Sequence, residues 1–424
     1  MDGLAIKTLR APVAPAVVEE LIALWALDDV FGCVGDDGAK AVRRAAKAVR
    51  GDAAANHPEL IIYVCQDQPT GKIAGTAVLL ISRDAPVVGT LGEVATHPDY
   101  RRRGIAAALC AQSRDDFKAL RGEVLMLGTT VVAASRLYHK TGYRRLPGTN
   151  AWWLNVRDDR SAEEWQVDYF RTAHATSTSP APPGSVASVS ICIGTAADRL
   201  RMPALFHVPH ESAVLDSNLK LYSTRAAVQS SVNGLYPRYA ALLDPLFANG
   251  GGDVVKDGSC HDHGLRGCWW ALRSKANAGA AGAAAAAADE KCAGLLVGLA
   301  TVAIVGDSCN NSVAWLDGFT HARWFEHHWE PLLATALAWV QATTSCAQCY
   351  ARIAASDAAK LAGFRGLGFK LVGASDGAAG LPTPAPAPPT PPLRARFVYE
   401  EGEEGPGYLG PAKSEASLLM AFSF

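Results

Sequence analysis

The chain has 424 residues, with 40 Lys and Arg against 41 Asp and Glu and a formal net charge of -1. This balance excludes the strongly basic character expected of a dedicated nucleic-acid binder, and no apolar run is long enough to span a bilayer. A hydrophobic fraction of 49% and a charged fraction of 19% are typical of folded globular proteins. The N-terminus lacks the pattern of a secretory signal, so we expect a cytoplasmic protein whose ten cysteines are mostly free thiols.

Changes in composition divide the chain into two domains. A stretch rich in Ser, Thr, Pro and Ala is expected to link them, and two biased segments read as insertions in the second domain. The expected segments are a first domain at 1–171, a linker at 172–188, a second domain at 189–400 with an Ala-rich insertion at 276–290 and a Pro-rich insertion at 381–392, and a C-terminal tail at 401–424. Residues 394–401 retain the character of a strand.

Hydropathy periodicity predicts the elements of the first domain in chain order: an edge strand, two helices, three strands, a helix, a strand, a short helix and a final strand. Their expected ranges are 4–10, 15–27, 37–49, 60–66, 72–82, 87–96, 103–119, 123–129, 133–140 and 151–156. Strands that first cluster and then alternate with helices indicate an α/β (α+β) domain with a mixed sheet.

The segment GEVATHPDYRRRGIAAAL, Gly92 to Leu109, carries the chemistry. Its strand ends at Thr96, and three arginines and Gly104 lead directly into a helix. A helix N-terminus has unpaired N–H groups and a partial positive charge, so a phosphate binds there well. Gly104 lets the backbone approach the anion closely, and the arginines would add charge-assisted contacts. The pattern predicts an anion site, although an isolated run of three arginines is more often a solvated surface.

The same segment resembles motif A of the GNAT superfamily of acyl-CoA-dependent N-acyltransferases, whose Gln/Arg-x-x-Gly-x-Gly/Ala pattern falls on Arg101, Gly104 and Ala106. Downstream, ASRLYHKTGYRRL is similar to motif B, with the family's tyrosine at Tyr138 and its Gly-Tyr ending at residues 142–143. The resemblance implies a mixed, mostly antiparallel central sheet flanked by helices, and acetyl-CoA as the co-substrate. Motif B often has an Asn where this chain has Val131, so the chain departs from the family at one residue that contacts CoA.

The resemblance also implies roles for single residues. The pyrophosphate of CoA would lie at the start of the helix, pantetheine would lie along the strand that ends at Thr96, and an amide near Val94 or Ala95 would polarise the thioester carbonyl. Tyr138 would protonate the departing thiolate, and Glu93 is the candidate general base, with pairing to an arginine as an equal alternative. The expected cofactor-binding residues are Val94, Ala95, Thr96, Arg101, Arg102, Arg103, Gly104, Ile105, Ala106 and Ala107.

The second half contains a degenerate copy of these motifs. Thr320-His321 aligns with Thr96-His97 without a gap over the next dozen residues. The replacements are Arg101 by Phe325, Gly104 by His328, Ala106 by Glu330 and Tyr138 by Phe364. A carboxylate and a bulky side chain at the helix start would exclude a pyrophosphate. We therefore expect two tandem GNAT-like domains, of which the second does not bind CoA and instead supports the first or forms one wall of its cleft.

The expected function is transfer of an acetyl group from acetyl-CoA to a primary amine by direct attack within a ternary complex. The alternatives are a non-catalytic acyl-CoA-binding or scaffolding protein, and an N-acyltransferase that uses a longer acyl donor. The identity of the amine is not indicated, and we expect neither nucleic acid nor a membrane as a partner. Two groups, Cys260–Cys268 and Cys346–Cys349, have zinc-like spacing but lie apart in the sequence, so we expect no metal.

Overall fold

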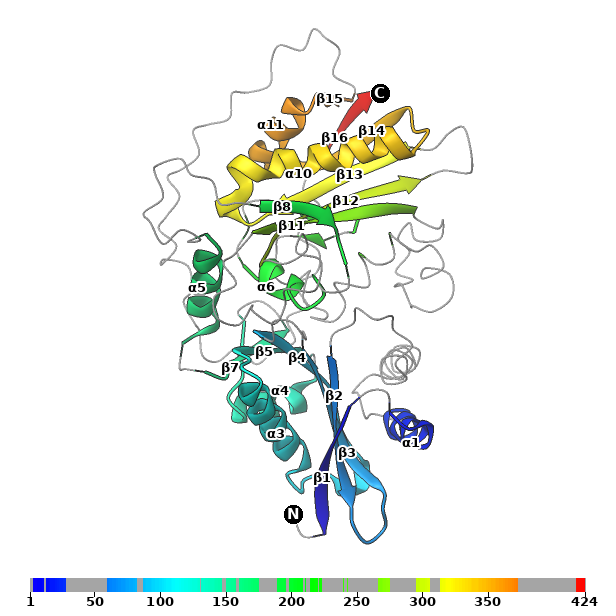
Figure 1. The fold of residues 1–424 in the computed structure, drawn as a ribbon, viewed down its shortest axis with the longest axis vertical. Coiled ribbons are helices and arrows are strands. Elements are labelled where there is room, and N and C mark those ends of the chain that lie inside the picture. The colour runs from blue at the N-terminus through cyan, green and yellow to red at the C-terminus, as the bar shows by residue number, and fades with distance from the viewer. Residues whose placement is uncertain are drawn as a thin grey trace.

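The described part of the chain builds two seven-stranded sheets, each flanked by helices (Figure 1). The computed structural model describes residues 3–10, 13–27, 59–81, 87–129, 131–146, 150–157, 160–174, 189–195, 198–208, 210, 214–219, 221–222, 239, 242, 266–274, 295–305, 313–372 and 417–423. The predicted helix at 37–49, both insertions and the possible strand at 394–401 lie outside these residues.

The first sheet has the strand order β1-β2-β3-β4-β5-β7-β6. Its pairs are antiparallel except β4 with β5, which confirms the predicted mixed, mostly antiparallel sheet. The elements are β1 (Leu4–Arg10), α1 (Pro15–Trp25), β2 (Glu59–Asp67), β3 (Ile73–Ile81), β4 (Val88–Thr96), η1 (Pro98–Tyr100), α3 (Ile105–Ala119), β5 (Val124–Gly128), α4 (Val132–Lys140), β6 (Arg144–Arg145) and β7 (Ala151–Asn155).

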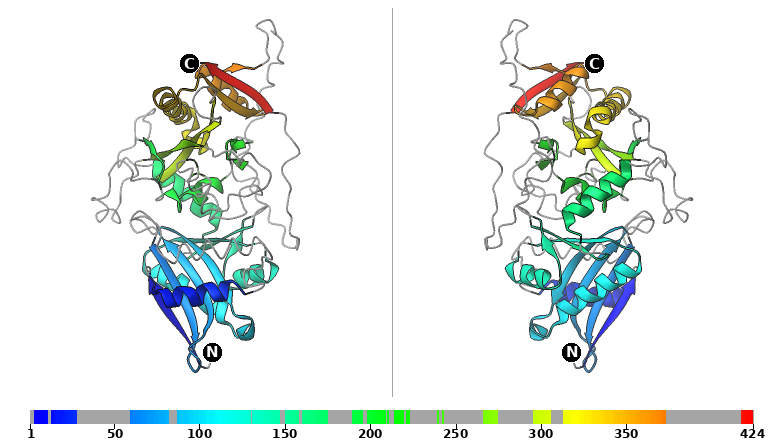
Figure 2. Two further views of the ribbon diagram at one scale, coloured as in Figure 1. Left: turned by 90° about the vertical axis from the view of Figure 1, so that its right-hand side faces the viewer. Right: turned by 90° about the vertical axis from the view of Figure 1, so that its left-hand side faces the viewer.

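Strand β2 shows why this sheet has a helix layer on each face. Its apolar residues are continuous, and neighbouring side chains of a strand point to opposite faces. Ile61 and Tyr63 therefore pack in the core that contains α3 and α4, whereas Leu60 and Ile62 pack in the core that contains α1. Helix α1 covers one face, and α3 and α4 cover the other (Figures 1 and 2).

Strands β4 and β5 separate along their length. Their parallel register runs only from Val88 and Val124 to Thr90 and Met126, although both strands continue. Beyond Thr90 the two strands therefore open a wedge between them. After β4 the chain passes through η1 and a short loop into the amino end of α3.

The second sheet repeats the topology of the first. Its order is β8-β11-β12-β13-β14-β16-β15, again with a parallel pair, β13 and β14, at the same place. The described elements are α5 (Ala162–His174), β8 (Val189–Ile193), α6 (Met202–Phe206), β9 (Val214–Asp216), β10 (Leu221–Tyr222), β11 (Arg266–Ser274), β12 (Leu295–Val305), β13 (Val313–Thr320), α10 (Ala322–Thr343), β14 (Gln348–Ala354), α11 (Ala358–Gly366), β15 (Lys370–Leu371) and β16 (Ser417–Ser423).

Two boundaries differ from the sequence prediction. Residues 417–423 form β16, which pairs with β14 and β15, whereas the sequence analysis assigned 401–424 to a tail. The partners of β16 are distant in sequence, so local composition did not reveal the pairing. Helix α5 continues to His174, past the expected start of the linker at Thr172.

Helices α5 and α6 join the two sheets (Figure 2). The Trp165 indole Nε1 donates to Glu123 Oε2 in the first half, at 2.9 Å. Five residues later, the Phe170 ring stacks on His321 of the second half, with centroids 4.3 Å apart. On α6, Ala204 packs beneath the first sheet, whereas Phe206 packs against Phe319 of the second.

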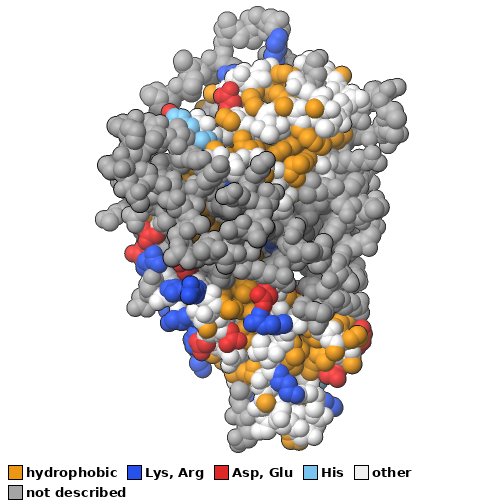
Figure 3. Space-filling model, in the orientation of Figure 1, with side chains coloured by type: hydrophobic (Ala, Val, Ile, Leu, Met, Phe, Trp, Pro, Cys, Tyr) orange, Lys and Arg blue, Asp and Glu red, His pale blue; other side chains and the backbone are white. Residues whose placement is uncertain are grey.

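Acidic and basic side chains are interspersed over the described surface of the first half on the face drawn in Figure 3. Their alternation accords with the net charge of -1.

Candidate functional site

Strand β4 carries a bulge at Glu93–Val94. These two residues lie opposite Ala77 of β3, between regular pairs on both sides. Glu93 has a φ of +46°, in the left-handed region that non-glycine residues rarely adopt. A bulge of this kind places its extra residue outside the regular ladder of strand hydrogen bonds.

Tyr138 lies on the same face of the sheet as the bulge. It is buried in α4 and packs edge-on against Tyr143, with centroids 5.7 Å apart. Burial first, and then the charges of Cys110 and Glu93, raise the pKa of Tyr138 above its ordinary value. The phenol therefore keeps its proton at neutral pH, and the carboxylate of Glu93 lies within its electrostatic range. The two residues predicted to be catalytic are therefore within electrostatic range of each other.

The loop after β4 ends in an open helix N-terminus. Residues 101–104 are exposed, and Gly104 is the N-cap of α3 with a φ of +80°. The amide of Ala108 donates to the Gly104 carbonyl at 3.0 Å, which is the first backbone bond of the helix. The amides of residues 105–107 therefore have no acceptor within the helix. An anionic group at Gly104 would meet these amides and the positive end of the helix dipole.

Asp67, at the end of β2, binds the turn that begins this loop. The sequence had not indicated Asp67 as part of the site. The Tyr100 hydroxyl donates to Asp67 Oδ2 at 2.9 Å, and the Thr70 hydroxyl donates to the same oxygen at 2.6 Å. These two bonds, that of Thr70 first, lower the pKa of Asp67. The Arg103 guanidinium lies 5.4 Å from the centre of the Tyr100 ring. The HPDY turn was visible in the sequence, but its partner on another strand was not.

The predicted alignment of the two halves is confirmed at the ends of β4 and β13. The amide of His97 donates to Ala74 O at 2.9 Å, and that of His321 donates to Val297 O at 2.8 Å. Both rings accept at Nδ1 from the amide two residues later, at 3.3 Å in each case. Because Ala74 and Val297 hold the same place on the neighbouring strands, the likeness extends beyond sequence.

The second half lacks the features of the anion site, for a reason that differs from the prediction. Helix α10 begins at Ala322, so Phe325, His328 and Glu330 lie inside the helix and not at its start. Helix therefore replaces the whole loop that carries the arginines in the first half. At the positions that match residues 105–107, Trp329 and Glu330 lie within the helix and Pro331 has no N–H to offer. In addition, β12 and β13 pair without an interruption from Gly298 to Val305, so this strand has no bulge.

Two aromatic residues, Trp329 and Phe364, pack between β13 and α11 in the second half. Trp329 is buried, and its indole donates to the Gly318 carbonyl on β13 at 3.1 Å. The ring packs edge-on against Phe364 of α11, at 5.2 Å between centroids. A Cβ built on Gly363 would come within 2.1 Å of the indole. The space between β13 and α11 is thus occupied by the side chains of the protein.

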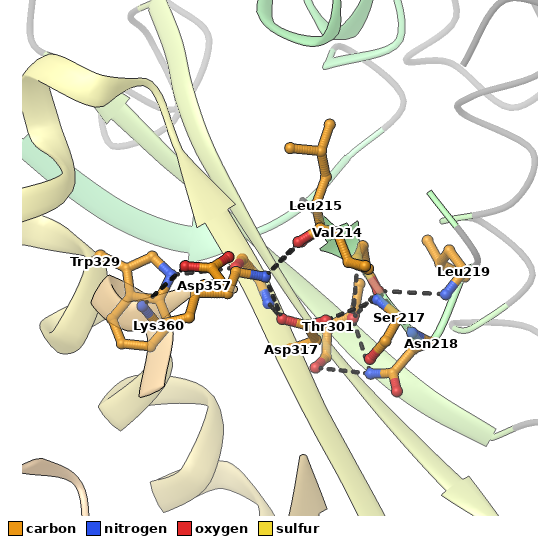
Figure 4. A network of polar contacts seen from close by, with 12 residues as sticks. Val214, Leu215, Ser217, Asn218, Leu219, Thr301, Asp317, Trp329, Asp357 and Lys360 are labelled. Carbon is orange, nitrogen blue, oxygen red and sulfur yellow. Dashed lines mark hydrogen bonds and ion pairs between the residues drawn. The ribbon is translucent and has the colours of Figure 1, made fainter. Parts of the chain in front are cut away.

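A buried polar network joins α11 to strands β9, β12 and β13 (Figure 4). Lys360 Nζ on α11 bonds to Asp317 Oδ1 at 2.7 Å and to the Val214 carbonyl at 2.8 Å. Next to this pair, the Thr301 hydroxyl donates to Asp216 Oδ2 at 2.8 Å. Burial, and secondarily the charge of Asp317, raise the pKa of Asp216 to about 7. These bonds connect strand β9 to β12 and α11. Nothing in the sequence pattern had indicated these residues.

Neither a metal centre nor a membrane span is found among the described residues. They contain no group of three or more His, Cys, Asp or Glu side chains placed to hold a metal ion. Cys346 and Cys349 are buried free thiols, and Cys260, His261 and His263 lie outside the described part. In that part, every helix is too short or too polar to cross a bilayer.

The chain was compared with family models, curated proteins and solved structures, and the family model matches in the first half. Residues 58–145, from β2 to β6, match the family model of the acetyltransferase (GNAT) domain. A GNAT-family acetyltransferase from Staphylococcus aureus Mu50 is 17% identical, with 36% of this chain and 100% of that chain covered and a TM-score of 0.29. The ribosomal-protein-S18-alanine N-acetyltransferase of Escherichia coli is 16% identical, with 38% of this chain and 97% of that chain covered and a TM-score of 0.28.

A GNAT-family N-acetyltransferase from Escherichia coli, solved in complex with CoA, is 18% identical; 37% of this chain and 83% of that chain are covered, at a TM-score of 0.27. No curated protein matches the chain.

Proposed function

The chain carries a GNAT acetyltransferase domain at residues 58–145, and we propose that this domain transfers an acetyl group from acetyl-CoA to a primary amine by direct attack in a ternary complex. One observation carries the proposal: the bulge of β4, the wedge between β4 and β5, and the open N-terminus of α3 follow one another along a single stretch of chain. Tyr138 lies on the same face of the sheet.

Each part of the site has a separate role in the proposed reaction. The pyrophosphate of CoA is held by the amides of residues 105–107 and by the arginines at 101–103. Acetyl-CoA supplies the activated acetyl group, and the amide of Val94 stabilises the negative charge that develops on its carbonyl oxygen. Tyr138 gives its proton to the departing thiolate. Glu93, close enough to affect the pKa of Tyr138, removes a proton from the amine directly or through water.

We propose that the second half is a copy of this domain that has lost its site and now supports the first half. The matching strand order supports common descent, and the contacts of α5 and α6 support the structural role. Phe170 stacks on His321, beside the end of β13 where the matching loop of the first half would begin. The end of the second copy that corresponds to the cofactor site is therefore part of the contact between the halves. A cytoplasmic location belongs to the same proposal.

The test is a screen of the full chain with acetyl-CoA and a panel of primary amines: small amines, polyamines, aminoglycosides and peptides with free N-termini. Thiol release and product mass are followed together, with Gly104→Glu as the inactive control. We expect one class of amine to gain an acetyl group. Acetyl-CoA binding without any acetylated product would instead support a non-catalytic acyl-CoA-binding protein. Faster turnover of a longer acyl-CoA would identify a different acyl donor.

A further inference from the structure

Thr76 links helix α1 to the bulge of β4. It lies in the middle of β3 and is fully buried. The indole Nε1 of Trp25, also buried, donates to the Thr76 hydroxyl oxygen at 3.0 Å. The same hydroxyl donates to the carbonyl oxygen of Glu93 at 2.9 Å. A continuous chain of hydrogen bonds thus runs from α1 through β3 to the residue with the left-handed φ.

The chemistry of the three groups fixes the direction of this chain. An indole N–H can only donate, and a carbonyl oxygen can only accept. The hydroxyl of Thr76 has a single proton, so it must accept from Trp25 and donate to Glu93. Trp25 therefore keeps the proton of Thr76 aimed at β4.

The bond to Glu93 orients the next amide as well. The carbonyl of Glu93 and the N–H of Val94 belong to one planar trans peptide unit, so they point in opposite directions. Thr76 bonds to Trp25, which packs in the core on the α1 face. The carbonyl of Glu93 is thus drawn toward α1, and the amide of Val94 is turned toward the face that holds Tyr138.

We propose that Thr76, aimed by Trp25, is a positioning residue that presents the Val94 amide to the thioester carbonyl. This inference rests on the proposed acetyl transfer and identifies the residue that orients its oxyanion donor. A left-handed φ at Glu93 is unfavourable and persists where neighbouring groups fix it, which is what the Thr76 hydroxyl does.

The second half provides an internal comparison. Leu299 lies opposite Phe319 in β12 and β13, as Thr76 lies opposite Ala95 in β3 and β4. Leucine has no hydroxyl, and the described register of β12 with β13 has no bulge at this level. The copy that lacks the hydroxyl therefore also lacks the turned peptide unit.

The experiment is isotope-edited infrared spectroscopy of acetyl-CoA, labelled with ¹³C at the thioester carbonyl and bound to the full chain. Polarisation by the amide lowers the stretching frequency of this carbonyl. The wild type and Thr76→Ser, which keeps the hydroxyl, are expected to show the shift. Thr76→Val is expected to lose at least about half of it while binding CoA normally, and kcat on any accepted amine should fall, by up to about a hundredfold.

Thr90→Val is the matched control, since it removes a buried hydroxyl of β4 that has no partner among the described residues. It should keep the full shift. If Thr76→Val does not fold, Trp25→Phe removes the indole donor, together with part of the buried ring, and should reduce the shift in part. A full shift in Thr76→Val, or no shift in a wild type that binds acetyl-CoA, overturns the inference. Absence of acetyl-CoA binding by the wild type overturns the proposed function itself.

Discussion

Tyr138 and Phe364 hold the same position in the two halves. Each lies near the end of a short helix and packs edge-on against the aromatic residue five positions later, at 5.7 Å for Tyr143 and 5.0 Å for Phe369. In both halves the amide of that later residue donates to the carbonyl of the earlier one at 3.0 Å. The second half has thus kept the packing of this position and lost the phenol hydroxyl that we propose as the proton donor.

Tyr138→Phe should lower kcat by about 10²- to 10⁴-fold, the range of general acid catalysis, and leave the affinity for CoA unchanged. Because burial raises the pKa of Tyr138, its titration should not limit activity on the alkaline side of neutrality. Tyr143→Phe is the control, since its hydroxyl is buried without a partner among the described residues. Steady-state kinetics with the best amine check this, and equal kcat values in the two variants would contradict the assignment.

Phe170→Ala should lower the free energy of unfolding by about 3 kcal/mol or more, because it empties a buried site between the two halves. Val167 lies one turn earlier on α5 with 53% of its surface exposed, so Val167→Ala should change the free energy by less than about 0.5 kcal/mol. Denaturant unfolding of the full chain measures both variants. Similar small effects would show that the contact of α5 with His321 does not join the halves.

Asp216→Asn should remove a pH dependence of stability. The pKa of this carboxyl is 3.8 ordinarily and about 7 in the folded protein, owing to burial and then to Asp317. Between these values the folded state keeps a proton that the unfolded state has lost. The contribution to stability is therefore complete below 3.8 and disappears as the pH rises through about 7.

The quantity to measure for Asp216 is the difference in unfolding free energy between wild type and Asp216→Asn at several pH values. A difference is needed because His321, with its pKa lowered to about 3 chiefly by burial, acts in the opposite direction. We expect the wild type to lose stability relative to the variant as the pH rises. A difference that is independent of pH would contradict the raised pKa.

The sequence predicted what depends on local pattern. Alternating or continuous apolar residues located the strands of the first sheet, and Gly104 with its arginines located the open end of α3. The bulge at Glu93–Val94 could not be predicted, because it depends on a hydroxyl of another strand and an indole of a helix more than fifty residues away in the chain. The pairing of β16 was missed for the same reason.

The second half shows a different limit of prediction from sequence. The alignment of Thr320-His321 with Thr96-His97 was right, and so was the loss of the tyrosine. The effect of Glu330 was misjudged, because the aligned residues continue one long helix and no longer mark a helix start. An alignment can match positions while the backbone at those positions changes its conformation.

The central claim is that the first half alone binds acetyl-CoA, at the N-terminus of α3. Calorimetric titration of acetyl-CoA into the full chain tests it most directly. Gly104→Glu is the site variant, and Glu330→Ala, at the position that matches Ala106, is the variant in the second half. We predict one site per chain, abolished by Gly104→Glu and unaffected by Glu330→Ala. Two sites per chain, or a site that survives in Gly104→Glu, would contradict the account.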